Sequence, residues 1–212
     1  MRHLVLILGF LVALSQAAVG GEVRELNRSF TLESQSSIRL DMPVAEVNVV
    51  GSSGRTVETE FTATCKRDQD CDEVLRHLDF ESHGSQNTLR VDLVGYPKWG
   101  KGRLELEGVV RVPKSVDVEI ELGVGELDIK GLEGDVRVEL GVGEINAWIE
   151  RAKTRSVTLD AGVGEVELYG TDRRVAGRRS MLVGSEVYWD EGPGKARVFL
   201  EVGVGEISVW ME

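Results

Sequence analysis

The chain has 212 residues, which is enough for one large domain or two small ones. It carries 36 acidic and 25 basic residues, and the resulting net charge of −11 repels phosphate backbones, which argues against nucleic acid as a partner. Its 25 glycines recur at intervals while prolines number only 4, so the composition indicates regular corners and not a flexible linker.

Residues 1–17 have the pattern of a secretory signal peptide. Arg2 precedes the apolar run Leu4–Leu14, which is too short to span a bilayer comfortably. No cysteine follows this run, so there is no site for a lipoprotein anchor, and no later apolar stretch is long enough to span a membrane. The sequence therefore predicts export to the periplasm or the extracellular space.

Cleavage of the signal peptide is expected after Ala17, because Ser15 and Ala17 are small residues at the −3 and −1 positions. Cleavage after Ala18 or Gly20 is an alternative, and an uncleaved anchor is another. The mature chain, residues 18–212, shows no clear linker, so we expect a single domain with an elaborated first half.

The two cysteines, Cys65 and Cys71, enclose five residues. In an oxidising compartment so close a pair is typical of a disulfide, and the chain-entropy model assigns this loop about 2.4 kcal/mol of stabilisation. A redox motif would need the shorter Cys-x-x-Cys spacing, and two cysteines alone cannot complete a zinc site. The sequence therefore predicts a structural disulfide.

The first half of the chain predicts short strands and one helix. Apolar residues alternate with polar ones in the strand segments, and Val74, Leu75 and Leu78 share one face of a helix that begins near Asp68 or Asp70. The expected strands are 37–50, 57–65, 88–93 and 104–112, and the expected helix is 68–78.

The second half, 116–212, contains a repeat. A Gly-Val-Gly-Glu segment recurs with its first glycine at 123, 141, 162 and 203, at intervals of 18, 21 and 41 residues. The last interval is about twice the others, and a degenerate copy, Met181–Val187, lies within it. Five copies at a period near 20 residues are typical of a repeat architecture.

Each copy predicts two strands joined by a corner. Apolar residues alternate before the corner, as in Val118, Ile120 and Leu122, and alternation resumes after it at Leu127 and Ile129. The two runs are out of phase, so a bulge or corner must absorb one residue, and glycine permits the positive φ this requires. We expect the corner valine to point inward. No helix or lysine follows, so a phosphate-binding loop is not indicated.

A turn of about 20 residues cannot bury its apolar face alone, whereas stacked turns bury it against their neighbours. The predicted fold is therefore all-β, a short β-solenoid resembling a single-stranded β-helix, with one short helix in the first half. The alternative is a meander of hairpins in a sandwich or barrel.

The order of these features resembles known bacterial families. An early strand pair ending in Val-Val-Gly, a short acidic helix and Arg111-Val112-Pro113-Lys114 precede the Gly-x-Gly-[Asp/Glu] repeats. This order, over residues 35–212, is similar to exported adhesin-like families of unknown function, and the phrase Gly-Val-Gly-Glu resembles toast-rack domains. The resemblance implies an exported β-helical domain with no established enzymatic activity and no transferable catalytic residues. The valine between the glycines departs from the commoner Ser-Gly-Ser-Gly-Asp form.

Candidate site residues follow from the repeat. The corner glutamates should form a ladder that either splays into solvent or recruits calcium, and the sequence indicates no other cofactor. Trp148, Tyr169 and Trp210, each four residues after a corner glutamate, should face outward as a binding face, with Trp148 beside Tyr169, unless they cap the strand ends. The glutamates are Glu126, Glu144, Glu165, Glu186 and Glu206.

Catalytic motifs are lacking in the sequence. His77 and His83 could bind a metal with Asp79 or Glu81, although histidines near a helix end are more often simply exposed. We expect a non-catalytic structural or interaction protein, adhesin-like, whose partner is an envelope protein or a surface glycan. The alternative is a carbohydrate-binding or carbohydrate-cleaving β-helix protein.

Overall fold

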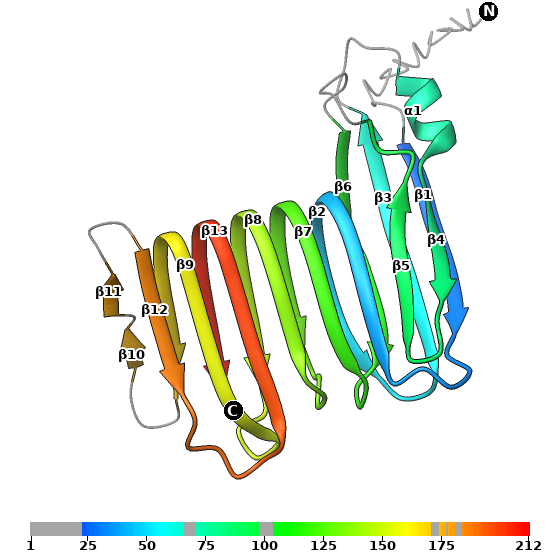
Figure 1. Ribbon diagram of the computed structural model, residues 1–212. Helices are drawn as coiled ribbons and strands as arrows, with labels where there is room; N and C mark the ends of the chain where they lie inside the picture. Colours follow the sequence, from blue (N-terminus) through cyan, green and yellow to red (C-terminus); the bar gives the residue numbers. More distant parts are fainter. Residues whose placement is uncertain (1–22, 66–70, 98–103, 171–173, 177, 181–183) are drawn as a thin grey trace, which may run out of the picture.

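The computed structural model describes residues 23–65, 71–97, 104–170, 174–176, 178–180 and 184–212 (Figure 1). The predicted signal peptide lies outside these residues. Strands make up 76% of the described chain, which also holds one short helix, and this confirms the all-β prediction. The elements are β1 (Val23–Thr31), β2 (Ser37–Ser52), β3 (Thr56–Cys65), α1 (Cys71–His77), β4 (Asp79–Gly84), β5 (Thr88–Val94), β6 (Leu104–Pro113), β7 (Asp117–Lys130), β8 (Val136–Ile149), β9 (Thr154–Tyr169), β10 (Arg174–Ala176), β11 (Arg178–Ser180), β12 (Gly184–Trp189) and β13 (Ala196–Met211).

Five long strands form the body of the molecule. Each of β2, β7, β8, β13 and β9 bends at its middle, so the half before the bend lies in one layer and the half after it in a second layer (Figure 1). Neighbouring strands pair in parallel and in the same register through both halves, in the order β2-β7-β8-β13-β9. These five strands therefore do not form hairpins with one another, and the sheet is not closed into a barrel.

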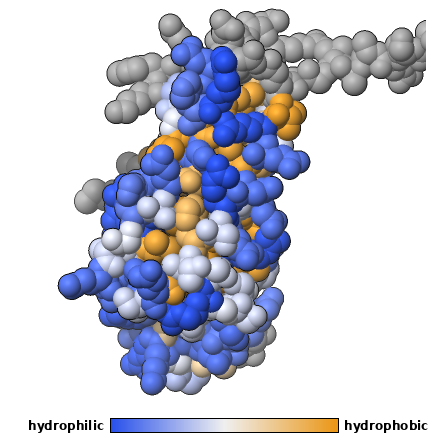
Figure 2. Space-filling model, turned by 90° about the vertical axis from the view of Figure 1, so that its right-hand side faces the viewer, coloured by the Kyte–Doolittle hydropathy of each residue, from blue (hydrophilic) through white to orange (hydrophobic). Residues whose placement is uncertain are grey.

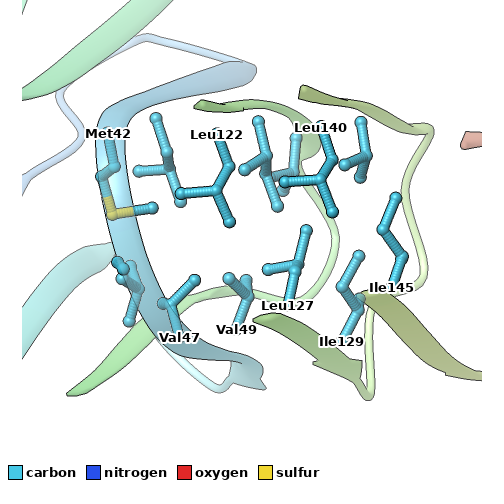
Figure 3. Close-up of a cluster of buried hydrophobic side chains, with 14 of the residues drawn as sticks. Met42, Val47, Val49, Leu122, Leu127, Ile129, Leu140 and Ile145 are labelled. Carbon is cyan, nitrogen blue, oxygen red and sulfur yellow. The ribbon is translucent and has the colours of Figure 1, made fainter. Parts of the chain in front are cut away.

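The core lies between the two layers. Residues on either side of each bend point toward each other, as Leu122 and Leu127 do in β7 and Leu140 and Ile145 do in β8 (Figure 3). These side chains are 0–3% exposed. At the edge opposite the bends, residues 131–135 carry the chain from the end of β7 in the second layer back to the start of β8 in the first. Buried Leu132, Ile149 and Met211 close the core there.

The corner valines point outward, so the prediction of an inward valine is wrong. Val124, Val142, Val163 and Val204 are 46–47% exposed. Their positions are on the convex side of the bend, and Leu122 and Leu127 or their equivalents already fill the interior behind them. The change of phase is absorbed by four consecutive outward residues, Gly-Val-Gly-Glu, between the two inward apolar residues.

The second glycine of each corner is required for two reasons, its positive φ and its close approach to the neighbouring strand. Gly125, Gly143, Gly164 and Gly205 have φ between 140° and 150°, which confirms the predicted positive φ. A Cβ on Gly143 would also lie 1.8 Å from the carbonyl oxygen of Gly125 in the neighbouring strand. The absence of a side chain thus lets successive corners approach closely enough to continue their parallel pairing.

The order of the strands in the sheet does not follow their order along the chain. β13, the last strand, lies between β8 and β9 and pairs with both in register. Two backbone hydrogen bonds at the edge opposite the bends hold β13 in this position. The Arg151 amide donates to the Glu212 carbonyl at 2.9 Å, and the Ala196 amide donates to the Lys153 carbonyl at 3.0 Å. The degenerate copy contributes β12, which runs antiparallel to the first half of β9 at the end of the stack.

At the other end of the stack, the two layers continue as separate sheets. The first half of β2 pairs with β5, and β5 with β4, whereas the second half of β2 pairs with β6, which leads to β3 and β1. The rings of Phe61 and Phe80 meet between these layers with centroids 4.8 Å apart. The helix α1 buries Leu75, in agreement with the sequence prediction. Strands β1 and β4 are not among those expected from the sequence.

Cys65 is buried at the end of β3, and Cys71 begins α1. The side chain of Cys71 lies outside the described residues, so the Cys65–Cys71 disulfide stays a prediction. Within the described ranges, no helix combines the length and apolar character needed to cross a membrane.

The corner geometry predicts unequal costs for two glycine substitutions. Gly54→Ala introduces strain at φ 122° with no atom near the new Cβ, and we expect it to lower the free energy of unfolding by about 1–2 kcal/mol. Gly143→Ala adds the overlap with the Gly125 carbonyl to the same strain, and we expect a loss above about 3 kcal/mol. Urea denaturation measures both, and equal losses would show that close corner contact is unimportant.

Candidate functional site

Three aromatic side chains form a row on the outer face of the second layer. Trp148 of β8, Trp210 of β13 and Tyr169 of β9 occupy the same register position, four residues after the corner glutamate. All three are half-buried, because the alternate residues on either side of them face the core. The predicted candidate binding residues therefore do lie together, and we call them the aromatic row.

The rings of the aromatic row are stacked on one another. The Trp148 and Trp210 centroids are 4.8 Å apart with planes inclined by 14°, and those of Tyr169 and Trp210 are 5.4 Å apart with planes inclined by 4°. The expected direct contact between Trp148 and Tyr169 is wrong, because β13 places Trp210 between them. The Lys130 ammonium lies 4.1 Å from the Trp148 centroid, a cation–π contact at the β7 end of the row.

This stacking decides which parts of the rings a ligand can reach. Trp210 has a ring on each side, and Trp148 lies between Lys130 of β7 and Trp210 of β13. Tyr169 stacks on Trp210 with one of its faces. For Trp148 and Trp210, the surfaces that remain for a ligand are mainly ring edges, which carry the positive side of the aromatic quadrupole and the indole N–H donor.

A polar row runs beside the aromatic row, two residues nearer the corner. Asn146, Ser208 and Glu167 are half-buried at equivalent positions of β8, β13 and β9. The Tyr169 hydroxyl donates a hydrogen bond to the Glu167 carboxylate. The outer face thus offers aromatic edges next to hydrogen-bonding side chains at the spacing of parallel strands, about 4.8 Å. Sequence reasoning did not identify the polar row, because its residue type changes from one repeat to the next.

The predicted glutamate ladder forms only in part. Glu126, Glu144, Glu206 and Glu165 are exposed and share one register position, which Glu46 of β2 extends. Glu186 does not belong to it, since antiparallel β12 pairs Glu186 with Asp160. Within the described part of the chain, no three His, Cys, Asp or Glu side chains gather into a group that could hold a metal ion. Calcium binding by this row stays a prediction.

The edge opposite the corners carries both signs of charge. The Lys114 ammonium lies 2.6 Å and the Lys153 ammonium 3.8 Å from the Glu133 carboxylate, and Arg197 contacts Asp135 at 2.6 Å. The hydrogen bond from Lys114 lowers the pKa of the Glu133 carboxyl below its ordinary value and raises the pKa of Lys114. Lys114, Lys153 and Arg197 at this edge therefore take part in ion pairs with acidic neighbours.

The two histidines lie apart from the aromatic row. His77 is exposed at the end of α1, where its Nδ1 lies 2.7 Å from the Glu73 carbonyl oxygen, and His83 is exposed in β4. Both belong to the end of the molecule that carries β1 and β4. That end shows a mainly hydrophilic surface interrupted by separate apolar patches (Figure 2).

Comparison with known proteins supports the fold. No protein-family model and no curated protein sequence matches the chain. Its structure is similar to that of a "putative cell adhesion protein" from Clostridium sporogenes, with a TM-score of 0.51 and 15% identity over 90% of this chain and 100% of that one. A "putative adhesin" from Bacteroides fragilis matches only weakly, with a TM-score of 0.34 and 10% identity over 88% of this chain and 97% of that one. The expected likeness to adhesin-like proteins is supported at the level of the fold, whereas the toast-rack likeness is not confirmed.

The aromatic row predicts a specific pattern of energetic coupling. A double-mutant cycle of Trp148→Ala and Trp210→Ala should give a coupling of about 0.5–1.5 kcal/mol, because their rings are in contact. The cycle of Trp148→Ala and Tyr169→Ala should be additive within about 0.5 kcal/mol, because Trp210 separates the two. Stabilities from chemical denaturation give both values, and strong coupling only in the second cycle would contradict the observed strand order.

Proposed function

We propose that this chain is an exported, non-catalytic, adhesin-like interaction protein that recognises its partner through the outer face of the second layer. The observation that carries the proposal is the aromatic row, three half-exposed rings aligned by three different strands. Aromatic side chains that remain accessible on a rigid scaffold are typical of interaction surfaces, since each contributes a large contact area at low cost in conformational entropy.

The scaffold is best understood as a short β-solenoid. Each complete repeat ascends in the first layer, bends at the glycine corner and descends in the second layer, and β7 crosses back directly to begin the adjacent β8. Equivalent residues of paired repeats therefore lie next to one another in both layers. Such an arrangement turns a single outward aromatic position into a continuous row, which suits recognition of an extended surface.

Export is supported by the first 17 residues, which combine a basic start, an apolar run and small residues before the expected cleavage site. The Cys65–Cys71 pair fits an oxidising compartment. The fold is shared with a protein from Clostridium sporogenes named for cell adhesion. Together these features support a location in the periplasm or outside the cell.

An envelope protein is the partner class that the ring geometry favours. Carbohydrate recognition by aromatic residues usually places a sugar ring against an open aromatic face, and the rings here use their faces on one another. A protein surface can instead pack against ring edges and hydrogen-bond to Asn146, Ser208 and Glu167. The proposal assigns no catalytic residue to this face.

The proposal predicts that Trp148→Ala and Tyr169→Ala leave folding largely intact but impair recognition. Capture of envelope proteins from a cell extract by the immobilised wild-type chain gives the reference, and a glycan array tests the carbohydrate alternative. We expect each variant to retain a cooperative thermal transition and to lose most of the captured material, because the contacting edges are removed.

Tyr188→Ala is the matched control. Tyr188 is 66% exposed and lies in β12, which pairs with the first-layer half of β9. The substitution therefore removes an accessible aromatic ring that lies away from the aromatic row. Capture should be unchanged in this variant. Equal capture by the wild type and the aromatic-row variants would refute the proposed binding face, and binding to the glycan array alone would replace the protein partner by a carbohydrate.

A further inference from the structure

The corners present a second exposed feature that the aromatic row does not explain. Val124, Val142, Val204 and Val163 lie at one register position of β7, β8, β13 and β9, and each is nearly half-exposed. We call these four residues the valine ridge. Each valine has a glycine on both sides, so no neighbouring side chain of its own strand shields it. The bends of these strands lie side by side along one edge of the stack (Figure 1), and the register places the ridge at these bends.

The valine ridge is separate from the aromatic row. The two lie six residues apart on each strand, which corresponds to roughly 20 Å along the second layer. They also differ in chemistry, because the ridge is aliphatic and the row is aromatic. A ligand of one surface therefore need not contact the other, and the inference drawn from the ridge does not depend on the proposed function.

Acidic side chains border the ridge on both sides. Glu144 and Glu206 are exposed two residues after the valines of β8 and β13, and Glu201 and Asp160 are exposed three residues before the valines of β13 and β9. Among the described residues, none of these four carboxylates forms an ion pair, whereas Glu121 and Glu139, at the equivalent position of β7 and β8, pair with Arg39 and Arg137. The carboxylates that a partner could pair with at the corner edge therefore include Glu201 and Asp160 before the valines and Glu144 and Glu206 after them.

The negative charge of the two borders indicates which kind of partner the valine ridge could bind. A second copy of the chain would bring two acidic borders together, and an anionic lipid surface would meet the same repulsion. A partner with an apolar stripe between basic residues would bury the valines and pair with both acidic borders. The exposed carboxylates would then supply electrostatic steering, and the valines would supply apolar area to be buried.

The spacing of the ridge favours a helical partner. Valines of adjacent strands lie about 4.8 Å apart, whereas apolar residues on one face of an α-helix repeat about every 5.4 Å along its axis. Equivalent side chains on one face of a β-strand repeat about every 6.6 Å, a poorer match. Four valines cover roughly 14 Å, or nearly three helical turns.

We propose that the valine ridge and its acidic borders form a docking site for a cationic amphipathic helix of another protein or peptide. The helix lies along the corner edge, its apolar stripe contacts the valines, and lysine or arginine side chains on both flanks of the stripe pair with the carboxylates. This docking site is separate from the aromatic row, and its occupant need not be the partner of that row.

A pair of synthetic peptides tests the docking site. The first is a helix of about 14 residues made of leucine and lysine with all leucines on one face, and the second has the same composition with the leucines dispersed around the helix. Fluorescence anisotropy with the full-length chain should show binding of the first peptide at least about tenfold tighter than the second. Binding should weaken with added salt, because exposed charges are screened.

Protein variants locate the site. Val142→Ser combined with Val204→Ser should weaken binding of the first peptide by about tenfold or more, and Glu144→Gln combined with Glu206→Gln should do so chiefly at low salt. Val23→Ser is the control for the valines, since Val23 is 59% exposed in β1 at the far end of the molecule. Glu25→Gln combined with Glu81→Gln is the control for the carboxylates, in exposed positions of β1 and β4.

Three results would overturn the proposal. Equal binding of the two peptides would show attraction by charge alone, and full binding by the valine variant would place the peptide elsewhere. A dimer in sedimentation velocity that is lost with the valine substitutions would assign the ridge to a second copy of the chain. The thermal transition of each variant identifies any loss of binding that is caused by unfolding.

Discussion

The close approach of successive backbones at the glycine corners is the constraint on which the rest of this structure depends. The carbonyl oxygen of Gly125 occupies the space that a Cβ on Gly143 would need, and the same relation holds between Gly143 and Gly205 and between Gly205 and Gly164. Parallel pairing can therefore continue around the bend without a break in register. In-register pairing aligns Leu122 with its equivalents inside, the valines on the convex edge and the aromatic rings on the outer face.

Much of this arrangement could be predicted from the sequence, because it follows from local patterns. The alternation around Leu122 and Leu127 predicts two half-buried strands, and their difference in phase predicts a corner with positive φ at glycine. The direction of the corner valine could not be obtained in this way. Counting by twos from Leu122 places Val124 inside, whereas a bend between two layers leaves four consecutive residues on its convex side. The corner of β2 was also missed, because Pro43 and Ala45 replace the two glycines.

The order of the strands could not be predicted, because the repeats are nearly equivalent. Any copy of the corner can pair with any other in the same register, so local pattern does not distinguish β13 beside β8 from β9 beside β8. The interval of 41 residues between Gly162 and Gly203 was the available signal. It includes β12, which covers the first-layer edge of β9 as an antiparallel strand, before the chain returns to the slot between β8 and β9. This insertion brings Trp210 between Trp148 and Tyr169, and it turns two separate rings into one stacked row.

Cysteine cross-linking tests the inserted position of β13 most directly. Asn146, Ser208 and Glu167 share one register position on the outer face of β8, β13 and β9, and adjacent parallel strands lie about 4.8 Å apart, within the range that a disulfide spans. Under mild oxidation, followed by peptide mass spectrometry, the account predicts a cross-link in the variant with Asn146→Cys and Ser208→Cys and in the variant with Ser208→Cys and Glu167→Cys. It predicts none in the variant with Asn146→Cys and Glu167→Cys. Efficient cross-linking of residues 146 and 167 without cross-linking of either to 208 would show that the strands stack in sequence order and would contradict the account.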